Sequence, residues 1–114
     1  MAVPDEADAP RSYPVRITGA LDWEASTALV LRVARAVDSA VAQRADELAI
    51  DLSEVEYVDT AGLRALIEGK RHAGEAGLGF RLVRVPTRVL RVVEMAALSR
   101  FFGLPSVRSR RSGR

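Results

Sequence analysis

Few residues of this 114-residue sequence are of the types that support catalysis, since it has a single histidine and no cysteine. Hydrolytic and acid/base enzymes usually need a histidine or paired carboxylates in a cleft. His72 directly follows Lys70 and Arg71, which predicts a place on the solvent face of a helix. The acidic residues are scattered, without the spacing of metal ligands. We therefore expect no enzymatic activity, no metal and no cofactor.

A glycine-rich stretch, residues 74–79, reads Gly-Glu-Ala-Gly-Leu-Gly. Phosphate-binding loops place their glycines between a strand and the N-terminus of a helix. This stretch instead follows an expected helix, and its spacing matches neither the dinucleotide-binding motif nor the P-loop. We interpret it as a helix end and a turn. One alternative hypothesis is nevertheless a small nucleotide-using protein. A thermal shift on adding nucleotide would support it.

The most informative segment is residues 59–63, Asp-Thr-Ala-Gly-Leu, which follows a short apolar strand and a loop and opens a helix. Backbone N–H groups at a helix N-terminus are unpaired and the local dipole is positive, so this junction suits a capping side chain and equally an added phosphate. Asp59 or Thr60 is expected to cap the helix. Gly62 costs about 1 kcal/mol relative to alanine in the first turn, which indicates that another backbone approaches it closely.

The elements that must position this segment alternate between strands and helices. Apolar patterning predicts strands over residues 13–18, 47–52 and 80–85, with residues 53–58 as a loop. Apolar residues at helical spacing predict helices over residues 23–41, 60–73 and 87–97. Asp22 stands where the N-cap of the first helix belongs. This order predicts an α/β domain with a mostly parallel sheet, because parallel neighbours need overhead connections.

The charge balance is close to neutral, with 17 Lys plus Arg against 15 Asp plus Glu. The arginines of the C-terminus and the acidic residues of the N-terminus offset each other and leave about +1 for the body of the chain. Such a balance does not favour a nucleic-acid surface, so we expect no direct DNA binding. We expect residues 1–12 to be a flexible, acidic, Pro-rich arm, residues 13–104 the domain, and residues 105–114 a flexible Arg-rich tail or, alternatively, a segment that binds an anionic partner.

The cellular compartment is expected to be the cytoplasm. The first residues lack the apolar block of a secretory signal, and no stretch approaches the ~18 apolar residues of a membrane span. Without cysteine there can be no disulfide framework of the kind that small secreted domains use.

Three landmarks in register resemble the STAS domain family, and within it the bacterial anti-sigma factor antagonists. They are Arg-Ile-Thr-Gly-Ala-Leu-Asp at residues 16–22; Ile-Asp-Leu at 50–52 followed by Val-Asp-Thr-Ala-Gly-Leu at 58–63; and residues 77–85 with 91–98. The resemblance covers residues 15–104. It implies a single α/β STAS-type domain with a mostly parallel or mixed sheet of four to five strands and helices packed on it. The first strand common in the family is not visible before Tyr13.

The resemblance also implies a function. Such a protein binds an anti-sigma factor, usually a serine kinase of the GHKL type, and thereby releases a sigma factor. In the family, the kinase phosphorylates the hydroxyl residue directly after the motif aspartate, here Thr60, and a PP2C-type phosphatase removes the phosphate. A charge of about −1.5 to −2 on the docking face is expected to weaken binding by repulsion. The residues implied at the partner-binding face are Asp22, Asp59, Thr60, Ala61, Gly62, Leu63 and Arg64.

Two residues depart from the family pattern. Thr60 stands where serine is commoner, and a β-branched acceptor is stiffer at χ1. Arg64 stands where glycine is frequent, and it adds a cation that can pair with a phosphate or an acidic partner. Asp22 matches a position near the kinase contact but serves equally well as a helix cap. The threonine motivates an alternative function, a STAS module acting as a stressosome-like scaffold or as the soluble STAS subunit of a lipid transporter.

Overall fold

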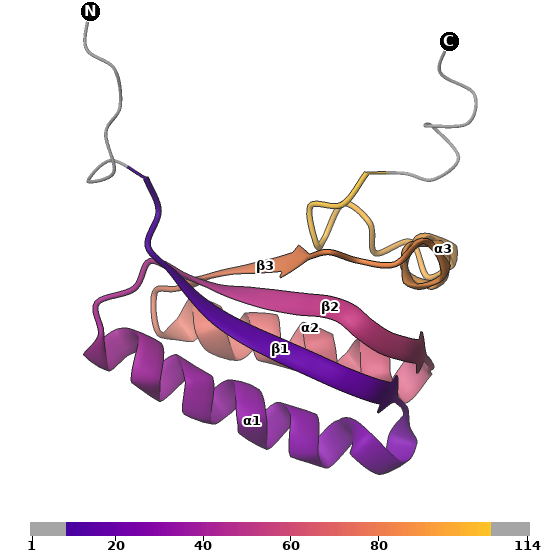
Figure 1. The fold of residues 1–114 in the computed structure, drawn as a ribbon, viewed down its shortest axis with the longest axis horizontal. Coiled ribbons are helices and arrows are strands. Elements are labelled where there is room, and N and C mark those ends of the chain that lie inside the picture. Colours follow the sequence, from indigo (N-terminus) through magenta and orange to yellow (C-terminus); the bar gives the residue numbers. More distant parts are fainter. Residues whose placement is uncertain (1–8, 106–114) are drawn as a thin grey trace, which may run out of the picture.

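Strands and helices alternate along the chain in the computed structural model, which describes residues 9–105 (Figure 1). The elements are β1 (Ser12–Leu21), α1 (Trp23–Ala42), β2 (Glu47–Val58), α2 (Thr60–Glu75), β3 (Gly79–Val83) and α3 (Thr87–Met95). The sheet has the order β1-β2-β3, and both strand pairs are parallel. The predicted α/β architecture with a parallel sheet is therefore confirmed.

The sheet has three strands in the described part of the chain, not the four to five that the STAS resemblance implied. After α3 the backbone forms turns instead of a further strand, because Phe102 donates its N–H to the Leu98 carbonyl at 3.1 Å and Leu104 donates to Ser99 at 2.8 Å. Most of the predicted acidic arm (residues 1–12) and of the predicted Arg-rich tail (residues 105–114) lies outside the described residues, in 1–8 and 106–114 respectively.

β2 is longer than predicted, since it continues to Val58 through the residues expected to form a loop. β1 pairs with it over its whole length, with register shifts between Arg16 and Thr18 and between Gly19 and Ala20. Such bulges break the alternation of buried and exposed residues. The apolar pattern therefore does not predict a strand in the second halves of β1 and β2.

β3 pairs only with the first half of β2, so along its second half this edge of β2 has no neighbouring strand within residues 9–105. Arg88 of α3 lies against this edge: its Nε donates to the Glu56 carbonyl at 2.7 Å and its Nη2 to the Val55 carbonyl at 3.3 Å. These hydrogen bonds tie α3 to the second half of β2, beyond the residues that pair with β3.

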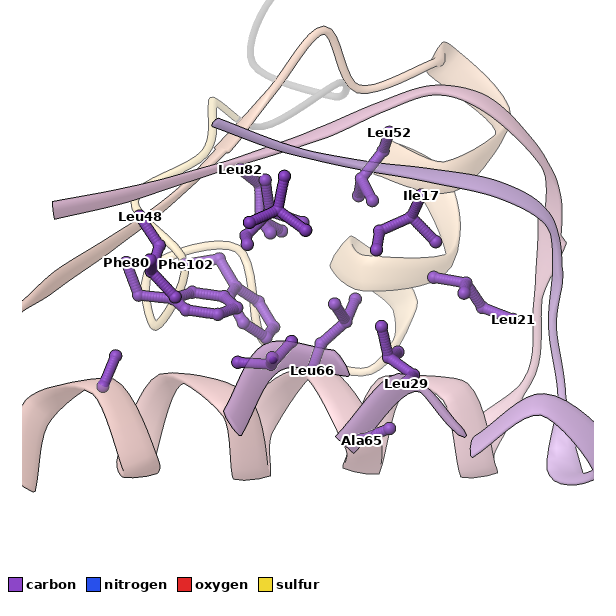
Figure 2. Packing of buried hydrophobic residues seen from close by; sticks show 14 of the residues in the cluster. Ile17, Leu21, Leu29, Leu48, Leu52, Ala65, Leu66, Phe80, Leu82 and Phe102 are labelled. Carbon is purple, nitrogen blue, oxygen red and sulfur yellow. The ribbon is translucent and has the colours of Figure 1, made fainter. Parts of the chain in front are cut away.

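The core lies between the sheet and the two long helices, α1 and α2, which cover the same face (Figures 1 and 2). Alternate residues of β2 point into this layer and are fully buried, as are residues of both helices: Leu48, Ile50, Leu52, Val33 and Leu66. Burying each such side chain contributes roughly 1.5–3 kcal/mol, so the two helices are held firmly on the sheet. Phe102 packs into the same layer near Phe80, with ring centroids 6.5 Å apart.

Each of α1, α2 and α3 is followed by a residue of positive φ, and the next N–H bonds back into the last turn of the helix. The left-handed residues are Arg44, Gly77 and Ala97. Gly77 follows α2, and the Leu78 N–H bonds the Ala73 carbonyl at 2.9 Å, which confirms that residues 74–79 end a helix. Ala97 follows α3, so that helix is shorter than predicted. No helix in residues 9–105 combines the length and apolar character needed to span a bilayer.

Candidate functional site

Asp59 links the N-termini of two helices at the end of β2. It is the N-cap of α2, and its Oδ1 accepts a hydrogen bond from the Gly62 N–H at 2.9 Å. Its Oδ2 accepts a second hydrogen bond, from the Trp23 N–H at the start of α1, at 3.3 Å. One carboxylate thus pairs with the unsatisfied donors of both helices and holds their N-termini together. Thr60 is therefore not the cap; it is the first residue of α2 and is exposed.

Asp22 caps α1, as predicted, and is itself bound by a tyrosine. Its Oδ1 accepts from the Ala25 N–H at 3.0 Å and its Oδ2 accepts from the Tyr57 hydroxyl at 2.9 Å. The hydrogen bond from Ala25, followed by that from Tyr57, lowers the pKa of Asp22. Conversely, the hydrogen bond to Asp22 and its negative charge raise the pKa of Tyr57. The carboxylates of Asp59 and Glu24 add to this rise, so several negative charges lie around the tyrosine.

The prediction of a close backbone approach at Gly62 is confirmed. A Cβ on this residue would lie 2.0 Å from the carbonyl oxygen of Leu21, the last residue of β1. The same carbonyl accepts the Asp59 N–H at 3.0 Å. The first turn of α2 therefore sits directly on the end of β1, which only a residue without a side chain allows.

The residues predicted for the partner-binding face gather at one end of the molecule but differ in exposure. Thr60 and Arg64 are exposed, and the other accessible members, Asp22, Asp59 and Ala61, are partly exposed. Gly62 and Leu63 are buried beneath them and support the first turn of α2. Trp23 is 79% exposed and lies beside this surface through its bond to Asp59.

Two residues of this site, Tyr57 and Trp23, were missed from the sequence. Tyr57 lies two residues before Asp59, which places both side chains on the same side of the extended chain. Trp23 directly follows the capping residue Asp22, and tryptophan is enriched at the centres of protein interfaces. The spacing of Tyr57 from Asp59 and the position of Trp23 next to Asp22 are therefore the sequence signals that could have identified these two residues.

A second charged cluster centres on Asp51, the aspartate of the Ile-Asp-Leu landmark, which is 8% exposed. It faces away from α1 and α2, because its neighbours in β2 point toward them. The Ser53 N–H donates to it at 2.9 Å, and the guanidinium Nε atoms of Arg84 and Arg16 lie 3.7 and 3.5 Å away. These groups, Ser53 first, lower the pKa of Asp51. The cluster links β1 and β2 to Arg84, the residue directly after β3, so Asp51 serves the sheet rather than the surface around Thr60.

The site thus offers an exposed threonine hydroxyl at a helix N-terminus, next to carboxylates that are already hydrogen-bonded. His72 is exposed on α2. Within residues 9–105 no three His, Cys, Asp or Glu side chains are grouped so that they could hold a metal ion.

Several solved structures share this fold. An anti-sigma factor antagonist from Mycobacterium paratuberculosis is 27% identical, with 90% of this chain and 84% of that chain covered and a TM-score of 0.64. The anti-sigma factor antagonist SpoIIAA in its unphosphorylated form is 14% identical, with 93% and 92% covered and a TM-score of 0.63. SLC26A9 is 18% identical over 89% of this chain, with a TM-score of 0.68, but the match spans 19% of that protein.

A further match is the protein Mglu, of which this chain covers 18%. The chain thus spans less than a fifth of the length of both SLC26A9 and Mglu. No curated protein matches it. The family model described as "Mlab, STAS domain" matches residues 6–106. Because that model spans nearly the whole chain and the antagonist structures have the same arrangement of strands and helices, this protein belongs to the STAS domain family.

Proposed function

We propose that this protein is an anti-sigma factor antagonist, a cytoplasmic regulatory protein rather than an enzyme, which binds an anti-sigma factor and so releases a sigma factor. The observation that carries the proposal is the likeness to the antagonist from Mycobacterium paratuberculosis, because it combines 27% identity with nearly full coverage of both chains. The likeness in fold to SpoIIAA supports it.

The partner is proposed to dock on the Thr60 face, which we define as the accessible residues Asp22, Asp59, Thr60, Ala61 and Arg64 with the buried Gly62 and Leu63 beneath them. Both helix caps and the Gly62–Leu21 contact fix the backbone of this face before any partner arrives. A preorganised surface loses less conformational entropy on binding, which favours affinity.

Phosphorylation is proposed to switch this binding off. An anti-sigma kinase of the GHKL type transfers the γ-phosphoryl group of ATP to Oγ1 of Thr60, and a PP2C-type phosphatase hydrolyses the ester. The Trp23, Ala25 and Gly62 N–H groups are already bound to Asp59 or Asp22. These three donors are not available to a phosphate on Thr60, which adds negative charge next to the Asp59 carboxylate, so the face repels a partner that fits the neutral threonine.

The experiment uses purified GHKL-type anti-sigma kinases of the source organism with ATP and this protein, followed by mass spectrometry of the intact chain and its peptides. We expect one phosphate, lost in Thr60→Ala and kept in Thr60→Ser. Thr87→Ala is the matched control, because Thr87 is also an exposed threonine at the first position of a helix. Phosphorylation should also weaken the complex with the kinase. Failure of every kinase to bind would overturn the proposal.

A second function has its own support: a STAS module that associates with a transporter or with itself as a scaffold. A sulfate transporter family protein from Wolinella succinogenes is matched with a TM-score of 0.66 at 15% identity, over 87% of this chain and 80% of that chain. Co-elution with transporter subunits, or self-association, in the absence of kinase binding would favour this alternative.

A further inference from the structure

An open groove runs along the outer sides of α1 and α2. Its volume is about 480 Å³. The apolar part of its lining consists of Trp23, Val30, Leu31, Ala61 and Ala65, and the polar part of Ser26, Thr27, Arg64 and Glu68. Trp23 is 79% exposed and Leu31 is 54% exposed. Two large apolar side chains held in water along one groove are typical of a surface that a partner covers.

The shape of the groove suits a helix. α1 and α2 lie side by side under the sheet and run in the same direction, since each connects parallel strands (Figure 1). The bond from the Trp23 N–H to Asp59 keeps their N-termini together. A furrow between two packed helices accepts the ridge of side chains of a third helix, with apolar residues recurring every three to four positions.

The charges along the groove favour an acidic occupant. Glu68 is paired with Arg71, which also pairs with Glu75 at 2.6 Å. Arg64 makes no ion pair with any residue that the structure describes. The unpaired charge of the groove lining is therefore positive.

We infer that this groove receives an amphipathic helix of the anti-sigma factor, with its apolar side against Trp23 and Leu31 and a carboxylate against Arg64. The inference rests on the proposed function and adds which surface and which secondary structure make the contact. Ala61 and Arg64 belong to both the groove and the Thr60 face, so one partner covers both. Arg64 lies one turn after Thr60, so a phosphate on Thr60 competes with the partner's carboxylate for the same guanidinium.

The test compares Leu31→Glu with Val41→Glu in binding to a purified anti-sigma kinase that binds the unmodified protein. Both residues are exposed aliphatics of α1, 54% and 51%, but only Leu31 lines the groove. We expect Leu31→Glu to weaken binding at least about tenfold, because it places a charge in an apolar contact. Val41→Glu should stay within about twofold of the parent, as surface substitutions usually do.

A second measurement follows Trp23, the single tryptophan of the chain, by labelling it with 5-fluorotryptophan. The ¹⁹F resonance should differ between H₂O and D₂O in the free protein, because the ring is exposed. It should lose that difference when unlabelled kinase is added. Labelling only this protein keeps the tryptophans of the kinase out of the spectrum.

The outcomes separate the inference from the function on which it rests. If the kinase binds but Leu31→Glu behaves like Val41→Glu and Trp23 stays exposed, the groove inference is overturned and the proposed function stands. If no kinase binds the parent protein, the proposed function fails and the inference with it. If Leu31→Glu instead abolishes self-association measured by sedimentation velocity and leaves kinase binding unchanged, the occupant is a second copy, which also overturns the inference.

Discussion

The carbonyl oxygen of Leu21 lies 2.0 Å from the point where a Cβ on Gly62 would stand, so the end of β1 and the first turn of α2 touch backbone to backbone. The same carbonyl accepts the Asp59 N–H at 3.0 Å. This contact joins the last residue of one strand to the segment that carries Thr60. It explains a glycine whose helix propensity alone is unfavourable by about 1 kcal/mol relative to alanine.

Gly62→Ala is therefore expected to lower the free energy of unfolding by at least about 2 kcal/mol, because the clash is with backbone that cannot move without disturbing β1. Urea denaturation measures this. Gly74→Ala is the matched control on the same helix, since a Cβ there meets nothing within 4 Å. It should raise stability by about 0.5–1 kcal/mol through helix propensity. Equal effects of the two substitutions would contradict the assigned role of Gly62.

The double cap by Asp59 predicts different effects for two substitutions. Asp59→Ala removes both hydrogen bonds and should cost about 1–2 kcal/mol of unfolding free energy. Asp59→Ser keeps an oxygen for the Gly62 N–H but is too short to reach Trp23 as well, so it should recover most of that loss. Amide hydrogen exchange of Trp23 should accelerate in both variants, whereas exchange of Gly62 should accelerate only in Asp59→Ala. Unchanged exchange at Trp23 would show that its bond to Asp59 does not hold α1.

The sequence was sufficient to predict the local parts of this site but not the link between its two helices. The close backbone approach at Gly62 and the N-cap by Asp22 could be predicted from the sequence. A glycine in the first turn of a helix and a capping residue just before a helix are both recognised from their position relative to that helix alone. The bond from Trp23 to Asp59 joins residues 36 positions apart and depends on how α1 and α2 lie on the sheet. The extension of β2 was missed because its second half, with Glu54 and Glu56 exposed, pairs through bulges that disturb the alternation.

Tyr57 should ionise at higher pH than an ordinary tyrosine, because its hydroxyl donates to Asp22 and negative charge surrounds it. In a Tyr13→Phe background, absorbance at 295 nm follows Tyr57 alone, since the chain has two tyrosines. Asp22→Asn should lower the pKa of Tyr57 most, Asp59→Asn less and Glu24→Gln least, in the order of their influence. Asparagine can still cap α1 through its amide oxygen, but its amide nitrogen cannot accept the Tyr57 hydroxyl, so the change reflects the loss of both the hydrogen bond and the negative charge.

The sign of the linked stability follows from the direction of this shift. The folded protein holds the phenolic proton more tightly than the unfolded chain, whose tyrosines ionise near pH 10. The stabilisation of the folded state by the protonated Tyr57 hydroxyl is therefore complete below about pH 10. It is lost as the pH rises through the pKa of Tyr57 in the folded protein. Tyr57→Phe should remove this alkaline loss, and an unchanged alkaline transition in that variant would rule out the tyrosine as its source.

Acid should weaken the three-stranded sheet through Asp51. Its pKa is lowered by the Ser53 N–H and by Arg84 and Arg16, so the unfolded chain binds a proton more readily than the folded one. The resulting stabilisation is present above the ordinary aspartate pKa of about 4 and disappears as the pH falls through the lower pKa of the folded state.

Asp51→Asn is therefore expected to destabilise the protein at pH 7 and to approach the parent in urea denaturation as the pH falls below about 4. The ¹³Cγ chemical shift of Asp51 tests the cause directly: its titration midpoint should lie below that of a free aspartate and move upward in Arg84→Gln. A stability difference between Asp51→Asn and the parent that is the same at pH 3 and pH 7 would mean that Asp51 stabilises the sheet through packing and hydrogen bonding, not through its charge.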